Sequence, residues 1–144
     1  MPRIDRCVSV KDTWDGGAIL KRRYVNRRDS MPLLRIQTNA VLDADAGKAL
    51  LAEASRAVAA LLGKPERYVM VSLETAATMT FGGDTSPLAY LEMKSIGLPQ
   101  ERTAALSTAL CELMNTALGV SADRVYIEFA DAQGHLWGWN GGTF

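Results

Sequence analysis

The stretch Leu33-Leu34-Arg35-Ile36-Gln37-Thr38 has the composition of a β-strand, and the elements predicted after it follow in a regular order. Its side chains alternate, which places Leu34 and Ile36 on one face and Leu33 and Arg35 on the other. Alternation of this kind is typical of a strand with one buried face. We therefore expect a β-strand over residues 33–38, with its apolar face against a core.

A helix is predicted directly after this strand. Asp43 and Asp45 suit the N-cap and the first turn, and Gly63 suits the position that ends the helix. Between them, apolar side chains recur at spacings of three and four residues, at Leu50, Leu51, Ala54, Val58, Leu61 and Leu62. The β-branched and aromatic run at residues 68–73 then predicts a second strand, which completes one β-α-β unit.

A second β-α-β unit follows in the same order. Residues 88–96 predict a strand, Pro99 suits the first turn of a helix, and residues 124–129 predict the closing strand. The buried stripe of this second helix is expected at Leu106, Leu110, Leu113, Met114 and Leu118. Gly119 is placed to end the helix.

Two short extra strands are predicted outside these units, at residues 78–81 and 136–139. The fold class is therefore α+β: two right-handed β-α-β units form a four-stranded mixed sheet with both helices on one face. The opposite face of the sheet requires cover, and the sequence predicts no third helix to supply it. Self-association is the simplest cover, so we predict an oligomer.

The bulk composition is that of one globular domain, with 144 residues, of which 48% are apolar and 22% charged. The formal net charge is zero, but residues 1–30 carry eight Lys or Arg and four Asp, a net charge of +4. These residues also lack a sustained hydrophobic period. We therefore divide the chain into an N-terminal extension at residues 1–30, expected to be disordered or an artefact upstream of the true start, and a domain at residues 31–144.

Several kinds of partner and cofactor are disfavoured by the sequence. The basic run at residues 21–28 has neither a helical nor an aromatic-stacking pattern, so we expect no nucleic-acid partner. No apolar run approaches the ~18 residues of a membrane span, and no signal-peptide pattern is present. Cys7, Cys111 and His135 have no disulfide or metal spacing, so no metal and no cofactor is expected. We expect a cytoplasmic protein, or one secreted without a signal peptide.

Short motifs along residues 31–144 fall in register with one known family. Residues 31–39, which open with Met31-Pro32, resemble the start of macrophage migration inhibitory factor proteins. The other matching motifs are Gly63-Lys64-Pro65 with Tyr68-Val69, Phe81-Gly82-Gly83, Ser95-Ile96-Gly97, Asp123-Arg124-Val125-Tyr126-Ile127, Gly138-Trp139-Asn140 and Thr143-Phe144. The resemblance implies the tautomerase fold of this family, assembled as a homotrimer with active sites between neighbouring subunits.

The activity implied by the resemblance is keto–enol tautomerisation of the phenylpyruvate tautomerase type, on a small enolisable keto acid. The family's base is an N-terminal proline, which corresponds to Pro32 after removal of Met31. A free prolyl nitrogen is a secondary amine, whereas a prolyl nitrogen inside a chain is an amide without useful basicity. A model α-amino group has a pKa of about 8. Desolvation and a nearby cation such as Lys64 would lower that pKa and leave an unprotonated base at neutral pH.

The resemblance also implies the residues around the base. Lys64 corresponds to a lysine that anchors the substrate carboxylate and steadies the enolate charge, although alone it would read as a solvated helix-end lysine. Ile96 corresponds to a residue whose main chain lines the pocket, and Tyr126 to one supplied by the adjacent subunit. Plain strand core is the alternative for Ile96 and Tyr126. Phe144 corresponds to an aromatic residue near the mouth of the pocket.

The chain departs from the better-known pattern at positions that bear on the substrate. Glu128 stands where animal members usually have a hydrogen-bond-donating asparagine, and an ionised carboxylate cannot donate. Trp137 replaces a small aliphatic residue and Leu33 a methionine beside the base, so both are expected to reshape the substrate pocket. These changes put phenylpyruvate-like substrates in question without removing the base. The family's Cys-x-x-Cys is also absent, because Leu88 and Leu91 stand there.

Catalysis by Pro32 requires a free nitrogen, and after Met31 this nitrogen is an amide. Either Met31 is the true start, or the extension is removed, or the activity has been lost. The alternative function is therefore a cytokine-like trimeric binding protein with vestigial or no catalysis. Dehalogenase or decarboxylase chemistry is disfavoured, because relatives with these activities pair the proline with arginines and only Arg35 lies near the amino-terminal strand.

Overall fold

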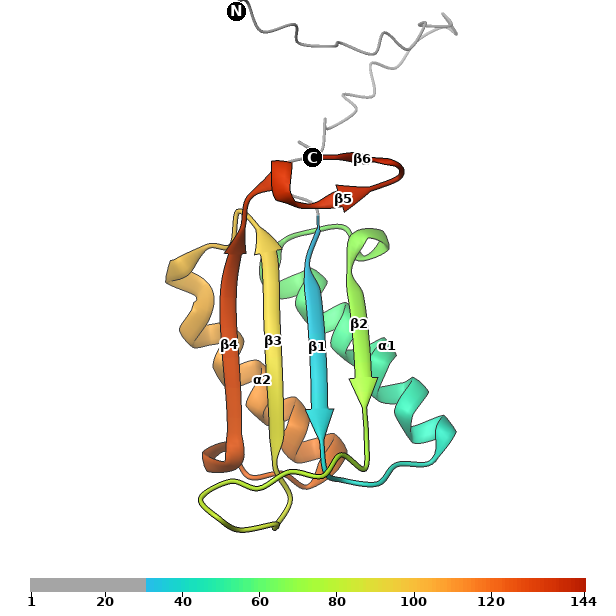
Figure 1. Ribbon diagram of the computed structural model, residues 1–144, viewed down its shortest axis with the longest axis vertical. Coiled ribbons are helices and arrows are strands. Elements are labelled where there is room, and N and C mark those ends of the chain that lie inside the picture. The colour runs from blue at the N-terminus through green and yellow to red at the C-terminus, as the bar shows by residue number, and fades with distance from the viewer. Residues whose placement is uncertain (1–30) are drawn as a thin grey trace, which may run out of the picture.

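Two β-α-β units form most of residues 31–144, the part of the chain that the computed structural model describes (Figure 1). The first unit contains β1 (Leu33–Thr38), α1 (Ala44–Leu62) and β2 (Met70–Glu74), and the second contains β3 (Ala89–Ile96), α2 (Thr103–Leu118) and β4 (Val125–Ala132). Short 3₁₀ turns are η2 (Glu66–Tyr68), η3 (Gln100–Arg102), η4 (Ala122–Arg124) and η5 (Gly134–Leu136). A small terminal hairpin consists of β5 (Gly138–Trp139) and β6 (Gly142–Thr143).

The sheet has the strand order β2-β1-β3-β4. Each unit contributes a parallel pair, β1 with β2 and β3 with β4, and the antiparallel pair of β1 and β3 joins the units. Both helices lie on the same face of the sheet (Figure 1). The predicted α+β class and the mixed four-stranded sheet with two helices on one face are therefore confirmed. The extension expected at residues 1–30 lies outside the described residues.

Local signals explain where the helices begin and end. The Asp43 carboxylate accepts a hydrogen bond of 2.7 Å from a backbone N–H in the first turn of α1, as predicted. Gly63 and Gly119 end the two helices with φ of 63° and 68°, a conformation that glycine adopts without strain. Pro99 does not lie in the first turn of α2, because the turn η3 intervenes and the helix begins at Thr103.

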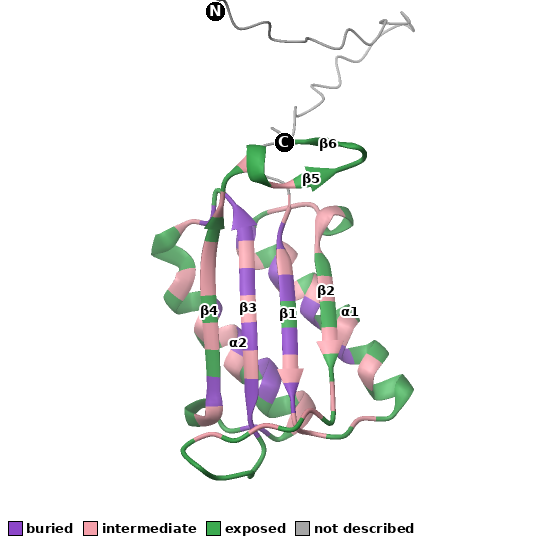
Figure 2. Ribbon diagram, viewed as in Figure 1, coloured by how far each residue is buried: buried purple, intermediate pink, exposed green. Residues whose placement is uncertain are grey.

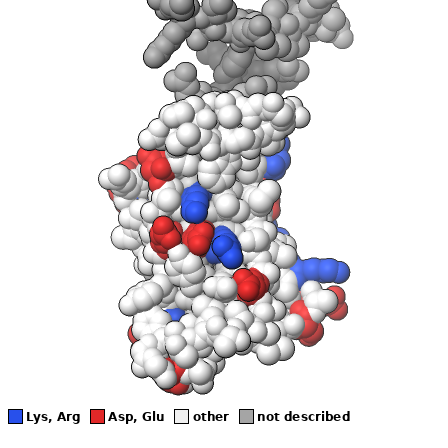
Figure 3. Space-filling model, in the orientation of Figure 1, with Lys and Arg blue, Asp and Glu red and all other residues white. Residues whose placement is uncertain are grey.

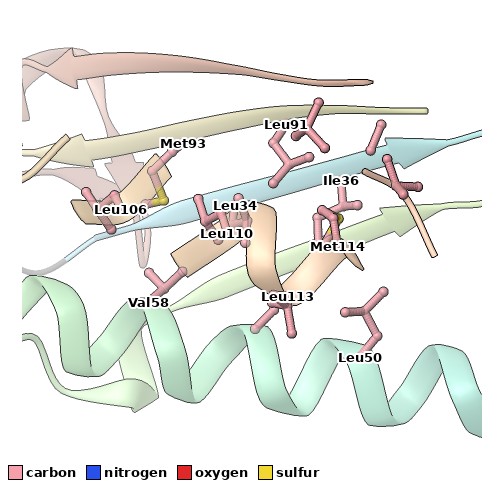
Figure 4. Close-up of a cluster of buried hydrophobic side chains, with 14 of the residues drawn as sticks. Leu34, Ile36, Leu50, Val58, Leu91, Met93, Leu106, Leu110, Leu113 and Met114 are labelled. Atoms are coloured by element: carbon pink, nitrogen blue, oxygen red, sulfur yellow. The ribbon is translucent and has the colours of Figure 1, made fainter. Parts of the chain in front are cut away.

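The hydrophobic core lies between the sheet and the two helices (Figure 4). Burial alternates along β1 and β3, so that one face of each strand is covered by helices (Figure 2). The sheet contributes Leu34, Ile36, Leu91 and Met93, and the helices contribute Leu50, Val58, Leu106, Leu110 and Met114. Full burial of one such side chain contributes roughly 1.5–3 kcal/mol, so this layer holds the helices against the sheet.

The other face of the sheet is mostly charged at its centre (Figure 3). Arg35 lies 3.8 Å from Glu74 and 3.9 Å from Glu92, and Lys94 lies 3.3 Å from Glu92. Each of these partly exposed pairs contributes roughly 0–1 kcal/mol. The charged centre of this uncovered face is therefore compatible with water.

Some predicted strand boundaries differ from the structure. Residues 78–81 do not form a strand, because the Gly82-Gly83 turn reverses the chain at once and leaves only an isolated bridge between Phe81 and Asp84. β2 begins at Met70 rather than at residue 68, which belongs to η2. The strand predicted at residues 136–139 is reduced to β5, because η5 extends to residue 136.

Candidate functional site

The start of β1 meets the end of β3 at one end of the sheet. Leu33 pairs with Lys94 in the antiparallel register, and one further step in this register sets Pro32 beside Ser95. On its other side, the Pro32 carbonyl accepts a hydrogen bond of 3.0 Å from the backbone N–H of Met70. Pro32 is fully buried. The neighbouring strands therefore fix its position on both sides.

Lys64 reaches the same end of the sheet from the end of α1. It follows Gly63, whose left-handed backbone turns the chain away from the helix axis. The Lys64 ammonium donates to Ser95 Oγ at 2.7 Å and to the Ile96 carbonyl at 2.7 Å. These bonds orient a half-buried cation at the end of β3.

Ser95 connects two of the predicted site residues, Pro32 and Lys64. It is fully buried, lies beside Pro32 in the register and accepts a hydrogen bond from Lys64. A role for Ser95 could not be predicted from the sequence, because a serine within an alternating strand carries no signal until its neighbours are known. Chemically, the arrangement places a cation near the start of β1, where it can bind a carboxylate by charge-assisted hydrogen bonds.

An aromatic cluster joins η2 to the C-terminal segment. The Tyr68 and Trp139 rings lie 6.3 Å apart at 83°, and the Trp139 and Phe144 rings lie 5.8 Å apart at 28°. The backbone N–H of Phe144 donates to the carbonyl of Trp137 at 3.2 Å. Phe144 thus packs on Trp139, and Trp137 contributes a main-chain contact. The sequence alone identifies Tyr68 and Trp139 only as residues of the family motifs.

Tyr126 and Glu128 lie well away from Pro32 within one chain. Tyr126 pairs with Tyr90, about five residues before Ser95 along β3, which corresponds to ~17 Å of strand. Its side chain is 66% exposed. The structure therefore brings Pro32, Lys64 and Ile96 together at one end of the sheet and leaves Tyr126 and Glu128 nearer the start of β4, away from that end.

Glu128 has a partner that the sequence analysis missed. The Tyr90 hydroxyl donates to Glu128 Oε2 at 2.6 Å. This hydrogen bond, followed by desolvation and the negative charge of Glu128, raises the pKa of Tyr90 to about 12. This pair could be predicted only once the strand register was known, because the register places Tyr90 and Glu128 on the same face of adjacent strands.

A pocket of about 310 Å³ opens beside Tyr126, near the start of β3 and β4. Its lining includes Met79, Phe81, Tyr90 and Tyr126. The Phe81 and Tyr126 rings lie 4.7 Å apart at 54°. This aromatic pocket is separate from the end of the sheet that holds Pro32.

Residues 31–144 contain neither a candidate metal site nor a membrane-spanning helix. No group of three or more His, Cys, Asp or Glu side chains in this range could hold a metal ion. None of the helices in the same range has the length and apolar character needed to cross a membrane.

Comparison with known proteins assigns the chain to a family. The family model described as macrophage migration inhibitory factor (MIF) matches residues 31–144. The chain belongs to the MIF family. The MIF homolog of Trichinella spiralis is 36% identical over 115 residues, which cover 79% of this chain and 100% of that protein. MIF of Rattus norvegicus is also 36% identical over 115 residues, covering 79% of this chain and 99% of that protein.

Solved MIF structures share the fold. The MIF homologue from Prochlorococcus marinus is 50% identical, with a TM-score of 0.74, and the match covers 78% of this chain and 98% of that one. The MIF structure from Trichinella spiralis is 34% identical, with a TM-score of 0.72, covering 78% and 99%. The predicted tautomerase fold of the MIF family is therefore confirmed.

Proposed function

We propose that this MIF-family chain is a keto–enol tautomerase of the phenylpyruvate type, with Pro32 as its general base and Lys64 as its carboxylate anchor. The observation that carries the proposal is the meeting of both residues at Ser95. Pro32 lies beside Ser95 in the strand register, and the Lys64 ammonium is hydrogen-bonded to it at 2.7 Å. The substrate class is a small enolisable keto acid.

The chemistry requires that Pro32 become the first residue. Its nitrogen is then a secondary amine, and burial together with the nearby Lys64 cation disfavours the protonated form. The amine takes a proton from the carbon next to the substrate carbonyl, and the proton is returned at the enolate oxygen. Lys64 holds the substrate carboxylate and stabilises the negative charge that develops.

We propose that four further residues of the same chain contact the substrate. Leu33 and the Ile96 main chain border the base. Trp137 and Phe144 belong to the C-terminal segment, near the mouth of the proposed substrate pocket at Pro32. These four residues come from the chain that supplies the base.

Tyr126 and Glu128 are proposed to come from a second copy in a homotrimer. The support is that Tyr126 lies ~17 Å along the sheet from the position of Pro32 within one chain. The MIF-family membership of the chain also favours an oligomer.

The test is turnover of aryl pyruvates by protein that begins at Pro32. Substitution Pro32→Gly is expected to lower kcat/KM by about 10²-fold or more, the usual contribution of a general base. The matched control retains Met31, which leaves every side chain unchanged and converts the Pro32 nitrogen to an amide. Equal turnover by the Met31-retaining protein would exclude Pro32 as the base.

A cytokine-like binding role without turnover is the second candidate. It is favoured wherever Met31 stays attached, because the Pro32 nitrogen is then an amide. Intact mass and amino-terminal sequencing of protein from its native source distinguish the two functions. A chain that begins at Pro32 supports the enzyme, and a blocked nitrogen supports the binding protein.

A further inference from the structure

Arg124, the last residue of η4 and directly before β4, holds the loop between β2 and β3. The Arg124 Nε donates to the Pro87 carbonyl at 3.0 Å. Its Nη2 donates to the carbonyls of Asp84 and Ser86 at 3.0 and 3.1 Å. Its Nη1 donates to the Phe81 carbonyl at 3.4 Å. Arg124 is only 17% exposed, so this loop is wrapped around its guanidinium.

The Asp84 side chain closes the same loop from within. Its carboxylate accepts hydrogen bonds from the Ser86 N–H at 3.0 Å and from the Ser86 hydroxyl at 2.8 Å. It also lies 3.7 Å from Arg124 Nη1. The hydrogen bonds from Ser86, followed by the charge of Arg124, lower the pKa of Asp84 below its usual value.

Two glycines form the turn before Asp84. Gly82 and Gly83 have φ of 60° and 77°, and Phe81 and Asp84 exchange backbone hydrogen bonds of 3.0 and 3.1 Å across them. Positive φ at both central positions is the pattern of a type I′ turn, and most residues other than glycine adopt this backbone conformation only with strain. The turn and the bonds to Arg124 together fix the backbone of Phe81.

The fastened loop presents the Phe81 ring to Tyr126. The guanidinium carbon of Arg124 lies 5.5 Å from the Phe81 ring centroid, and the Phe81 and Tyr126 rings lie 4.7 Å apart. Tyr126 is otherwise largely exposed on β4. The Phe81 ring therefore limits the side-chain rotamers open to Tyr126.

We infer that Arg124 is a positioning residue, which fixes the Phe81 loop and thereby the orientation of the Tyr126 ring. The consequence for catalysis rests on the proposed function, in which Tyr126 contacts the substrate held by a second copy. Charge alone does not explain the arrangement, because a planar guanidinium fork reaches several carbonyls at once and a lysine ammonium acts from a single point.

The substitution Arg124→Lys keeps the charge and removes the fork. In the Pro32-initiated protein we expect KM for an aryl keto acid to rise about fivefold with kcat within about twofold, because a contact shared by ground and transition states affects KM alone. Arg56→Lys is the matched control, since Arg56 is exposed on α1, and wild-type KM is expected.

A double-mutant cycle tests the route through Tyr126. In a Tyr126→Ala background, Arg124→Lys should change KM by less than about twofold, because the effect passes through the missing ring. An equal rise of KM in both backgrounds would overturn the inference and identify Arg124 as a general stabiliser of the fold. If Arg124→Lys does not fold, Phe81→Leu removes the ring contact instead, and the same rise of KM is expected.

A spectroscopic measurement separates this inference from the proposed function. The NMR resonances of the Tyr126 ring, identified by their loss in Tyr126→Phe, are expected to shift in Arg124→Lys and to stay unchanged in Arg56→Lys. A shift in protein that turns over no keto acid would support the positioning role and count against the tautomerase. Unchanged Tyr126 resonances in both Arg124→Lys and Phe81→Leu would overturn the inference, whatever the activity.

Discussion

At the scale of single residues, the candidate site depends on hydrogen bonds that hold long, polar side chains in place. Lys64 is oriented by Ser95 and Ile96, and Glu128 is the acceptor for Tyr90. Ordering such side chains costs conformational entropy, which these hydrogen bonds offset. The Glu128 carboxylate therefore already accepts a hydrogen bond from its own chain, from the Tyr90 hydroxyl.

The Tyr90–Glu128 pair predicts an alkaline titration. Tyr90 has a pKa of about 12 against the ordinary 10.0, so the folded protein keeps a proton that the unfolded chain loses between these values. The stability due to this bond is therefore present below pH 10 and lost as pH rises toward 12. Ultraviolet titration of tyrosinate should show a late-titrating phenol, absent in Tyr90→Phe.

The control for this prediction changes only the acceptor. Glu128→Gln should lower the pKa of Tyr90 toward 10.0, because the hydrogen bond to a carboxylate is its largest cause. Glu74→Gln, on β2, should leave the titration unchanged. A late titration that persists in Glu128→Gln would show that Glu128 is not responsible.

At the scale of elements, the ends of the helices position the site. Lys64 follows α1 directly, so the C-terminal end of this helix sets where the ammonium begins its reach toward Ser95. The beginning of α1 depends on Asp43, whose carboxylate accepts the backbone hydrogen bond of 2.7 Å. The residues that cap and end α1 therefore help to position Lys64 at the end of the sheet.

Loss of the Asp43 cap should destabilise the domain. Asp43→Ala is expected to lower the free energy of unfolding by about 1 kcal/mol, because a backbone donor in the first turn loses its acceptor. Denaturant unfolding followed by circular dichroism measures the change. Asp43→Asn retains a capping oxygen and should stay near the wild-type value, and equal losses in both variants would point to charge rather than capping.

At the scale of the whole molecule, we propose that the site is shared between copies. One chain supplies Pro32 and Lys64 at one end of its sheet, while its Tyr126 lies ~17 Å along the sheet, beside a different pocket. A shared site makes activity depend on assembly. Dilution below the dissociation constant of the oligomer is then expected to abolish turnover.

Mixed oligomers provide the sharpest test of sharing. Pro32→Gly and Tyr126→Ala proteins are each expected to be impaired, but co-refolded mixtures contain some sites with an intact Pro32 from one copy and an intact Tyr126 from another. Activity of the mixture should therefore exceed the average of the two separate proteins. Activity equal to that average, in mixtures shown by mass spectrometry to contain both chains, would contradict a shared site.

The sequence alone predicts the two β-α-β units, the cap at Asp43 and the end of the first helix at Gly63, and it contains the family motifs. These features depend on periodicity and on contacts within a few residues, which a chain carries locally. The strand predicted at residues 78–81 was wrong, because a strand exists only where a partner strand continues beside it.

The partners of the charged and polar side chains could not be predicted from the sequence, because they depend on the three-dimensional fold. Lys64 and Ser95 are 31 residues apart, and Tyr90 and Glu128 are 38 apart. Arg124 likewise binds carbonyls of a loop about 40 residues earlier. The physical reason is that strand order and register bring such atoms within hydrogen-bond distance, and no local pattern records which distant residue arrives there.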